Sequence, residues 1–135
     1  MEAALKAYEQ ACALHEKAGD GLGEASALVS LGNVQFKKGA LDAALQYYHL
    51  ALKLHERGGN VMGQARALTN VGSVMGRQGQ LTAALDTLHR ARGFYLEIED
   101  DCRGLQAVDK LIARFERQIE EKKINLETIS AGPLS

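Results

Sequence analysis

The chain has 135 residues, of which 46% are hydrophobic, so we expect a single domain with one continuous core. A formal net charge of −1 argues against nucleic acid and anionic membranes as partners. No apolar run approaches the ~20 residues of a membrane span. No signal segment opens the chain, and the two cysteines have neither metal nor redox spacing. We therefore expect a cytoplasmic protein.

A shift of 40 residues aligns the sequence with itself. Residues 21–60 match residues 61–100 at 13 positions, and residues 1–20 match residues 41–60 at nine. Such a period predicts stacked structural units that share a core. We expect one repeat domain over residues 1–123 and a flexible tail over residues 124–135. The domain divides into a partial unit (1–20), two full units (21–60 and 61–100) and a capping helix (101–123).

The first expected helix, over residues 1–18, aligns with the second helix of a full unit. The first helix of that unit is missing, so Leu5, Tyr8 and Cys12 lack the neighbour that would cover them. Two interpretations stay open. The chain is a fragment of a longer array, or this face pairs with a partner or a second copy to form a homodimer.

Apolar residues at helical spacing predict two helices in each full unit. Gly39 and Gly79 follow the first helix of each unit, where a left-handed residue commonly ends a helix. Asp42 and Thr82 are suitable N-caps for the second helix. The predicted helices span residues 24–38, 42–57, 64–78 and 82–98.

Two glycines, Gly32 and Gly72, lie inside predicted helices, where glycine costs about 1 kcal/mol relative to alanine. A helix tolerates this cost where a neighbouring helix comes close. We expect the close neighbours to be the small residues Ala44 and Ala84 of the second helices.

The last predicted helix, over residues 101–123, has Ile112 where the earlier units have glycine. An isoleucine is acceptable there if no further helix approaches. The far end of this helix is highly charged, which suits a solvated cap. Beyond it, residues 124–135 show no helical period, which favours a loosely ordered tail.

Several small and apolar residues resemble the signature of the tetratricopeptide repeat: Leu31-Gly32, Gly39, Ala44, Tyr48 and Ala51, with counterparts 40 residues later. The resemblance covers residues 3–118, and the period is similar to that of Pins-type adaptors. It implies an all-α, right-handed α-solenoid of antiparallel helix pairs, with about six helices. It also implies a protein-binding scaffold that has no catalytic activity and no cofactor.

The sequence departs from the signature at two points in each unit. The aromatic residue expected in the third turn of the first helix is replaced by Gln35 and Met75. The proline that ends the second helix in the short form of the repeat is replaced by Glu56 and Leu96. Both changes suit longer helices.

The resemblance implies that the first helix of each unit lines a concave, partner-binding groove. Asparagine and serine there would pair with an extended peptide backbone, and arginine and lysine with acidic groups. Carried over residue by residue, the groove consists of Ser26, Ser30, Asn33, Lys37, Arg66, Asn70, Ser73, Arg77, Gln106, Lys110 and Arg117.

One row of this groove, Lys37, Arg77 and Arg117, is basic in every unit and predicts an acidic protein or peptide partner. The alternative is that these cations lie at helix C-termini and complement the helix dipole. The carboxylate clamp of chaperone-binding repeats is matched only at Asn33, Asn70 and Lys110. Val29 and Gln106 replace its other two cations.

Little in the sequence indicates catalysis or metal binding. The histidine pairs His15 with His55 and His49 with His89 are each one period apart, so the repeat alone explains their spacing. No phosphate loop, dinucleotide fingerprint or nucleophile elbow is present. Two alternatives to a scaffold remain: an oligomerisation segment of a larger repeat protein, and a sensor domain with a closed apolar pocket.

Overall fold

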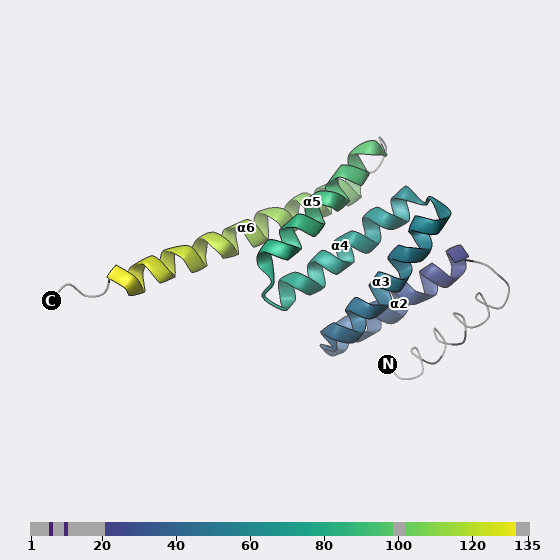
Figure 1. Cartoon of the computed structure of the whole chain (residues 1–135), viewed down its shortest axis with the longest axis horizontal. Helices are drawn as coiled ribbons and strands as arrows, with labels where there is room; N and C mark the ends of the chain where they lie inside the picture. The colour runs from purple at the N-terminus through teal and green to yellow at the C-terminus, as the bar shows by residue number, and fades with distance from the viewer. Residues whose placement is uncertain (1–5, 7–9, 11–20, 99–101, 132–135) are drawn as a thin grey trace.

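The computed structural model describes Lys6, Gln10, residues 21–98 and residues 102–131. This part of the chain forms five helices and no strand: α2 (Gly21–Lys38), α3 (Leu41–Gly58), α4 (Val61–Arg77), α5 (Leu81–Glu97) and α6 (Cys102–Ala131) (Figure 1). The expected first helix, including Leu5, Tyr8 and Cys12, lies almost wholly outside the described residues. The proposed pairing face on that helix therefore stays a prediction.

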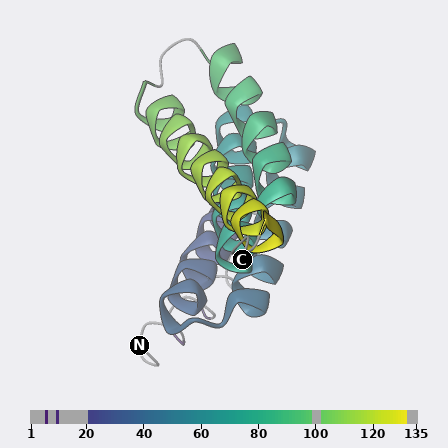
Figure 2. The same ribbon diagram turned by 90° about the vertical axis from the view of Figure 1, so that its left-hand side faces the viewer.

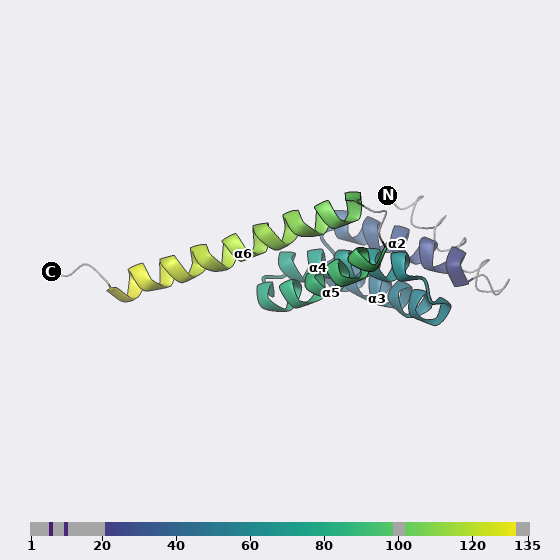
Figure 3. The ribbon, with the colours of Figure 1, turned by 90° about the horizontal axis from the view of Figure 1, so that it is seen from above.

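The helices stack in chain order. Each of α3, α4 and α5 packs antiparallel between its two chain neighbours, and α4 also contacts α6. Seen from above, α3 and α5 lie on one side of the stack and α6 on the other (Figure 3). The predicted all-α solenoid of antiparallel helix pairs is confirmed.

The turns between helices are closed by glycines in the left-handed conformation. Gly39, Gly59 and Gly79 have φ of 83°, 65° and 84°, where glycine is strongly favoured. After α2, the amide of Ala40 donates to the carbonyl of Gln35 at 2.9 Å, and the same bond recurs at the next two turns. This pattern is the Schellman motif, so the glycine stops predicted from sequence are confirmed.

The predicted N-caps Asp42 and Thr82 are wrong. α3 and α5 begin directly after the turn, with Ala40 and Gln80 at the N-cap and no side-chain cap bond. The glycine turn is so short that Asp42 and Thr82 already belong to the first helical turn. In α4, by contrast, the Asn60 side chain accepts a hydrogen bond from the Gly63 amide at 3.0 Å.

Small residues bring the helices together, but the nearest neighbours of Gly32 and Gly72 are large side chains and not the predicted alanines. A Cβ on Gly32 would lie 2.6 Å from the Tyr48 ring, and one on Gly72 would lie 2.8 Å from Leu88. Both glycines therefore make room for a large side chain of the next helix. The backbone carbonyl of Ala84 is a more distant neighbour of Gly72, at 3.4 Å.

The last helix is longer than predicted. α6 runs to Ala131, whereas the predicted helix ends at Lys123 and a loose tail is predicted from residue 124. Amphipathic periodicity reports burial against a neighbour, and residues 120–128 are exposed, so the pattern fades although the helix continues. From residue 105 to residue 131 the sequence contains no glycine or proline, which would favour a helix end, and both follow at positions 132 and 133.

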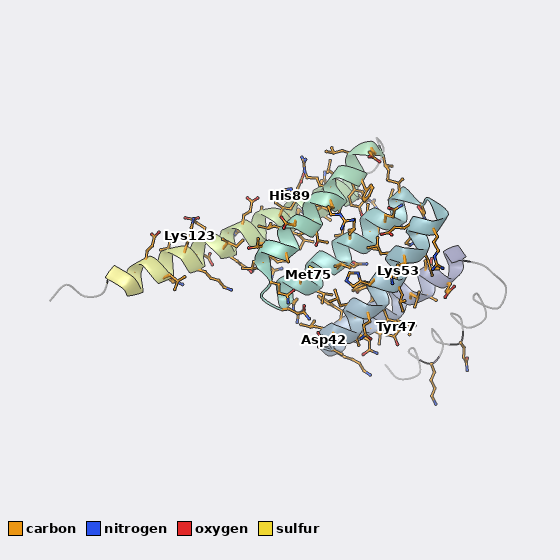
Figure 4. All side chains as sticks on the ribbon, in the orientation of Figure 1. Asp42, Tyr47, Lys53, Met75, His89 and Lys123 are labelled. Carbon is orange, nitrogen blue, oxygen red and sulfur yellow. The ribbon has the colours of Figure 1, made fainter. Side chains whose placement is uncertain are left out.

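The distal part of α6 projects beyond the other helices, and Lys123 lies on it (Figures 1 and 4). Figure 2 views the molecule from this projecting end. Ile124 and Leu126 are 53% and 64% exposed there. In the described part of the chain, no helix combines the length and apolar character needed to cross a membrane.

Candidate functional site

A cavity of about 600 Å³ opens between the ends of α2 and α4 and the middle of α6. Exposed side chains such as Asn33, Arg77 and Arg114 stand at its rim, so it is open to solvent. It is lined by Asn33, Phe36, Tyr48, Asn70, Ser73, Gly76, Arg77, Leu111, Arg114, Phe115 and Gln118. Cations and amides therefore surround a partly aromatic interior.

A second hollow of about 520 Å³ runs along α6 beside the cavity. The two share Arg114 and Gln118, so they form one continuous surface. The hollow is lined by Lys110, Ala113, Arg114, Arg117, Gln118 and Glu121. Three cations and one carboxylate make it predominantly basic.

The structure brings together six of the eleven groove residues predicted from sequence. Asn33, Asn70, Ser73 and Arg77 line the cavity, and Lys110 and Arg117 line the neighbouring hollow. The cavity lies toward the C-terminal ends of α2 and α4, so Ser26 and Arg66, which lie nearer their N-terminal ends, are left out. Five predicted residues line neither space: Ser26, Ser30, Lys37, Arg66 and Gln106.

Tyr48 fixes one wall of the cavity. Its hydroxyl donates a hydrogen bond to Oδ1 of Asn33 at 2.5 Å. Tyr48 is only 3% exposed, and this burial raises the pKa of its hydroxyl to about 12. The hydroxyl therefore keeps its proton at neutral pH and remains a donor. The carbonyl oxygen of Asn33 accepts this bond, while its amide nitrogen has no hydrogen-bond partner among the described residues.

Phe115 of α6 forms another wall, because Gly76 of α4 makes room for it. A Cβ on Gly76 would lie 2.2 Å from the tip of the Phe115 ring. Gly76 stands one period after Phe36, so the two repeats place an aromatic ring and a gap at equivalent positions. The cavity residues that were not predicted from the sequence are Phe36, Tyr48, Gly76, Leu111, Arg114, Phe115 and Gln118. The signal available in the sequence was the replacement of Phe36 in the first full unit by Gly76 at the equivalent position of the second.

Arg77 is held by an aromatic ring. Its guanidinium lies over Phe36, 4.9 Å from the ring centroid, which is the geometry of a cation–π contact. Arg77 is also the last residue of α4, so it complements the helix dipole as well. Arg117 lies inside α6, and the helix-end interpretation of the basic row does not apply to it.

The serines are oriented by their own helices. The hydroxyl of Ser73 donates to the Thr69 carbonyl at 3.0 Å, and that of Ser30 donates to the Ser26 carbonyl at 3.1 Å. Ser73 therefore offers the cavity an acceptor. Among the residues that line the cavity, none is acidic.

His55 belongs to a joint between the two full units. It is 8% exposed, and its ring lies where a Cβ on Gly63 would be, 2.2 Å from Nδ1. Burial, together with the charge of Arg66, lowers the pKa of His55. Asn60 Nδ2 lies 3.2 Å from His55 Nδ1 and, as a donor, matches a neutral imidazole. Within the described ranges, no three histidine, cysteine or acidic side chains are grouped to hold a metal.

Comparison with known families supports the repeat assignment. The profile described as tetratricopeptide repeat matches residues 23–97, more than half of the chain. This range covers α3, α4 and α5 and all but the first two residues of α2. A comparison with curated proteins found no match.

Proposed function

Because this chain belongs to the tetratricopeptide repeat family, whose repeats generally mediate protein–protein interactions, we propose that it is a cytoplasmic scaffold that binds a partner peptide or helix in its concave groove. The observation that carries this proposal is the cavity between α2, α4 and α6. It collects Asn33, Asn70, Ser73 and Arg77 from two repeats in one place. It needs no catalytic group and no cofactor.

The chemistry of the surface favours an acidic segment. Arg77 and Arg114 line the cavity, and Lys110 and Arg117 continue the positive charge along α6. Arginine binds carboxylates through two parallel hydrogen bonds, and the amides of Asn70 and Gln118 suit an extended backbone. Cations and amides at an open rim also distinguish this space from the closed apolar pocket of a sensor.

The carboxylate clamp of chaperone-binding repeats finds little support. Asn33 and Asn70 line the cavity, but Lys110 lies in the neighbouring hollow and Gln106 in neither. Val29 packs against the hydrophobic core. The proposed partner therefore meets a different set of groups.

The proposal is tested with a fluorescence-polarisation screen of short peptides rich in acidic and C-terminal sequences. The double variant Asn70→Ala, Arg77→Ala removes one amide and one guanidinium from the cavity. We expect affinity to fall about 100-fold, from one charged and one neutral hydrogen bond. The matched control is Arg90→Ala, Asn125→Ala, which removes the same groups from exposed sites outside the cavity.

Equal binding by the wild type and the cavity variant, or binding lost equally in both variants, would reject the groove as the functional site. Circular dichroism and melting of all three proteins separate lost contacts from lost structure. If no peptide binds, the alternative of an oligomerisation segment gains weight. Sedimentation of the chain over a range of concentrations tests that alternative and the homodimer through the first helix.

A further inference from the structure

The cavity has an apolar wall that the preference for an acidic partner does not use. Phe36, Leu111 and Phe115 line the cavity together with the Tyr48 ring, and they come from α2, α3 and α6. The arginines of the cavity, by contrast, are exposed and stand at its rim. The site therefore presents two kinds of surface to a partner, a charged rim and an apolar wall.

Leu111 is the part of this wall that departs most from the repeat. The equivalent residues one and two periods earlier are Val71 and Leu31, which are only 1% and 2% exposed. Leu111 is only partly buried and lines the cavity. A position that belongs to the core in the two full units thus leaves apolar surface open in α6. Covering that surface with another apolar group is favourable.

Phe36 is the other partly buried member of the wall, and it is held in place. It packs against the cluster of buried residues that contains Tyr48 and Val74. The guanidinium of Arg77 lies over its ring, 4.9 Å from the centroid. The ring cannot turn away without losing both contacts, so this part of the wall is formed before a partner arrives. A preformed wall reduces the ordering cost of binding.

The size and charge of the cavity indicate what would cover the wall. Its volume of about 600 Å³ lies within the range of roughly 300–1,000 Å³ typical of ligand pockets, so it can admit a large side chain with its adjoining backbone. None of the residues that line it is acidic, and Arg77 and Arg114 suit carboxylates on either side of the inserted group.

We propose that the cavity holds one large aliphatic or aromatic side chain of the partner, here called the anchor, while acidic residues next to the anchor pair with the rim arginines. This inference rests on the proposed function and adds an apolar requirement to it. A segment that is acidic alone would leave Leu111 and Phe36 in contact with water. Apolar side chains that fill a pocket contribute a large share of the affinity in protein interfaces.

The probes are acidic pentapeptides with leucine, phenylalanine or alanine at the centre and glutamates on both sides, measured by isothermal titration calorimetry. We expect the leucine and phenylalanine peptides to bind at least about tenfold more tightly than the alanine peptide. This anchor-to-alanine ratio should be the same at low and high salt, because apolar burial is not screened, and the heat-capacity change should be more negative for the anchor peptides. Equal affinity of all three peptides overturns the inference.

Ser73→Leu fills the cavity from α4. The Ser73 hydroxyl bonds to the Thr69 carbonyl of its own helix, so the substitution removes no bond between helices. We expect the anchor-to-alanine ratio to fall toward one, because the added side chain occupies the space of the anchor. Ser26→Leu is the matched control, since Ser26 is exposed on α2 and lines neither the cavity nor the neighbouring hollow. An unchanged ratio in Ser73→Leu, or an equal fall in both variants, contradicts the proposal.

Leu111→Ala shortens the wall instead of filling the space. We expect the anchor-to-alanine ratio to fall at least about threefold, from the loss of apolar contact. Leu50→Ala, at a site 48% exposed and outside the cavity, should leave the ratio unchanged. Circular dichroism and melting establish that both variants fold, and a ratio that stays the same in folded Leu111→Ala removes Leu111 from the site.

The outcomes separate this inference from the proposed function. If the peptides bind through Asn70 and Arg77 but the anchor-to-alanine ratio is one, only the anchor is rejected. If no peptide binds, the proposed function fails with it. Sedimentation gives a further check: self-association that Ser73→Leu abolishes would show that a second copy occupies the cavity, and the partner anchor would be rejected.

Discussion

The joint between the two full units makes a sharp prediction for Gly63→Ala. Gly63 is in the first turn of α4, and an added Cβ would lie 2.2 Å from Nδ1 and 2.4 Å from Cγ of His55. Because Cγ is the ring atom nearest the backbone, tipping the ring cannot relieve the overlap. His55 is buried and hydrogen-bonded to Asn60, so a movement of the whole residue also disturbs that bond.

The magnitude follows from three contributions. Overpacking of a buried site costs about 1–3 kcal/mol. Loss of the bond between His55 and Asn60 costs about 1 kcal/mol. Alanine is favoured over glycine in a helix by up to about 1 kcal/mol, which offsets part of this. We therefore expect Gly63→Ala to lower the free energy of unfolding by about 1–3 kcal/mol.

Gly93→Ala is the matched control. Gly93 lies inside α5, is exposed, and has nothing within 4 Å of an added Cβ. Only the helix preference remains, so we expect stabilisation by about 0.5–1 kcal/mol. Urea unfolding followed by far-ultraviolet circular dichroism measures both variants. The two substitutions must change the free energy of unfolding in opposite directions. The packing explanation fails if Gly63→Ala stabilises the protein as much as Gly93→Ala does.

Three further predictions concern contacts between helices. Since burial lowers the pKa of His55 below its ordinary value of 6.5, the folded chain binds fewer protons than the unfolded one just below that pH. The contribution of neutral His55 to stability is complete above pH 6.5 and decreases as the pH falls toward the pKa of the folded state. In denaturation experiments, the free energy of unfolding of His55→Gln should therefore fall less over this range than that of the wild type. Asn60→Ala removes the N-cap of α4 and a partner of His55, and should cost about 1–2 kcal/mol in urea unfolding, whereas a comparable loss in the exposed Asn125→Ala would contradict this. A double-mutant cycle on Arg92 and Asp109, whose Nε and Oδ1 lie 2.8 Å apart on a half-exposed surface, should give a coupling of only about 0.2–1 kcal/mol that shrinks with salt; a larger, salt-independent value would contradict it.

The repeat period predicts most of the fold because it reports both helix boundaries and packing at once. Gly39 and Gly79 are separated by one period and both end a helix, as predicted. The partners of the internal glycines were harder to foresee. Small residues such as Ala44 suggested close backbones, but the space at Gly32 is filled by Tyr48, a side chain four residues further along the same helix face.

The site was predictable only in part. The groove positions carried over from the family indicate which face of each helix a residue lies on, but not where the stacked helices form a concave surface. Asn33, Asn70 and Arg77 were found because they repeat in register. Phe36 and Phe115 were missed because their roles depend on residues two helices away. Phe36 contacts Arg77 of α4, and Phe115 fills the space beside Gly76 of α4. Three-dimensional curvature decides which row faces a cavity, and a periodic sequence does not encode it directly.

The stacking of helices in chain order has a thermodynamic consequence. With contacts chiefly between successive helices, the free energy of this chain is close to a sum of nearest-neighbour terms, and the ends can melt before the middle. The cavity is an exception to this nearest-neighbour sum, because its walls come from α2, α3, α4 and α6. A bound segment would connect units that are otherwise coupled only through their neighbours. Ligand binding should therefore make the unfolding transition steeper as well as raise its midpoint, because an interaction between distant units increases cooperativity.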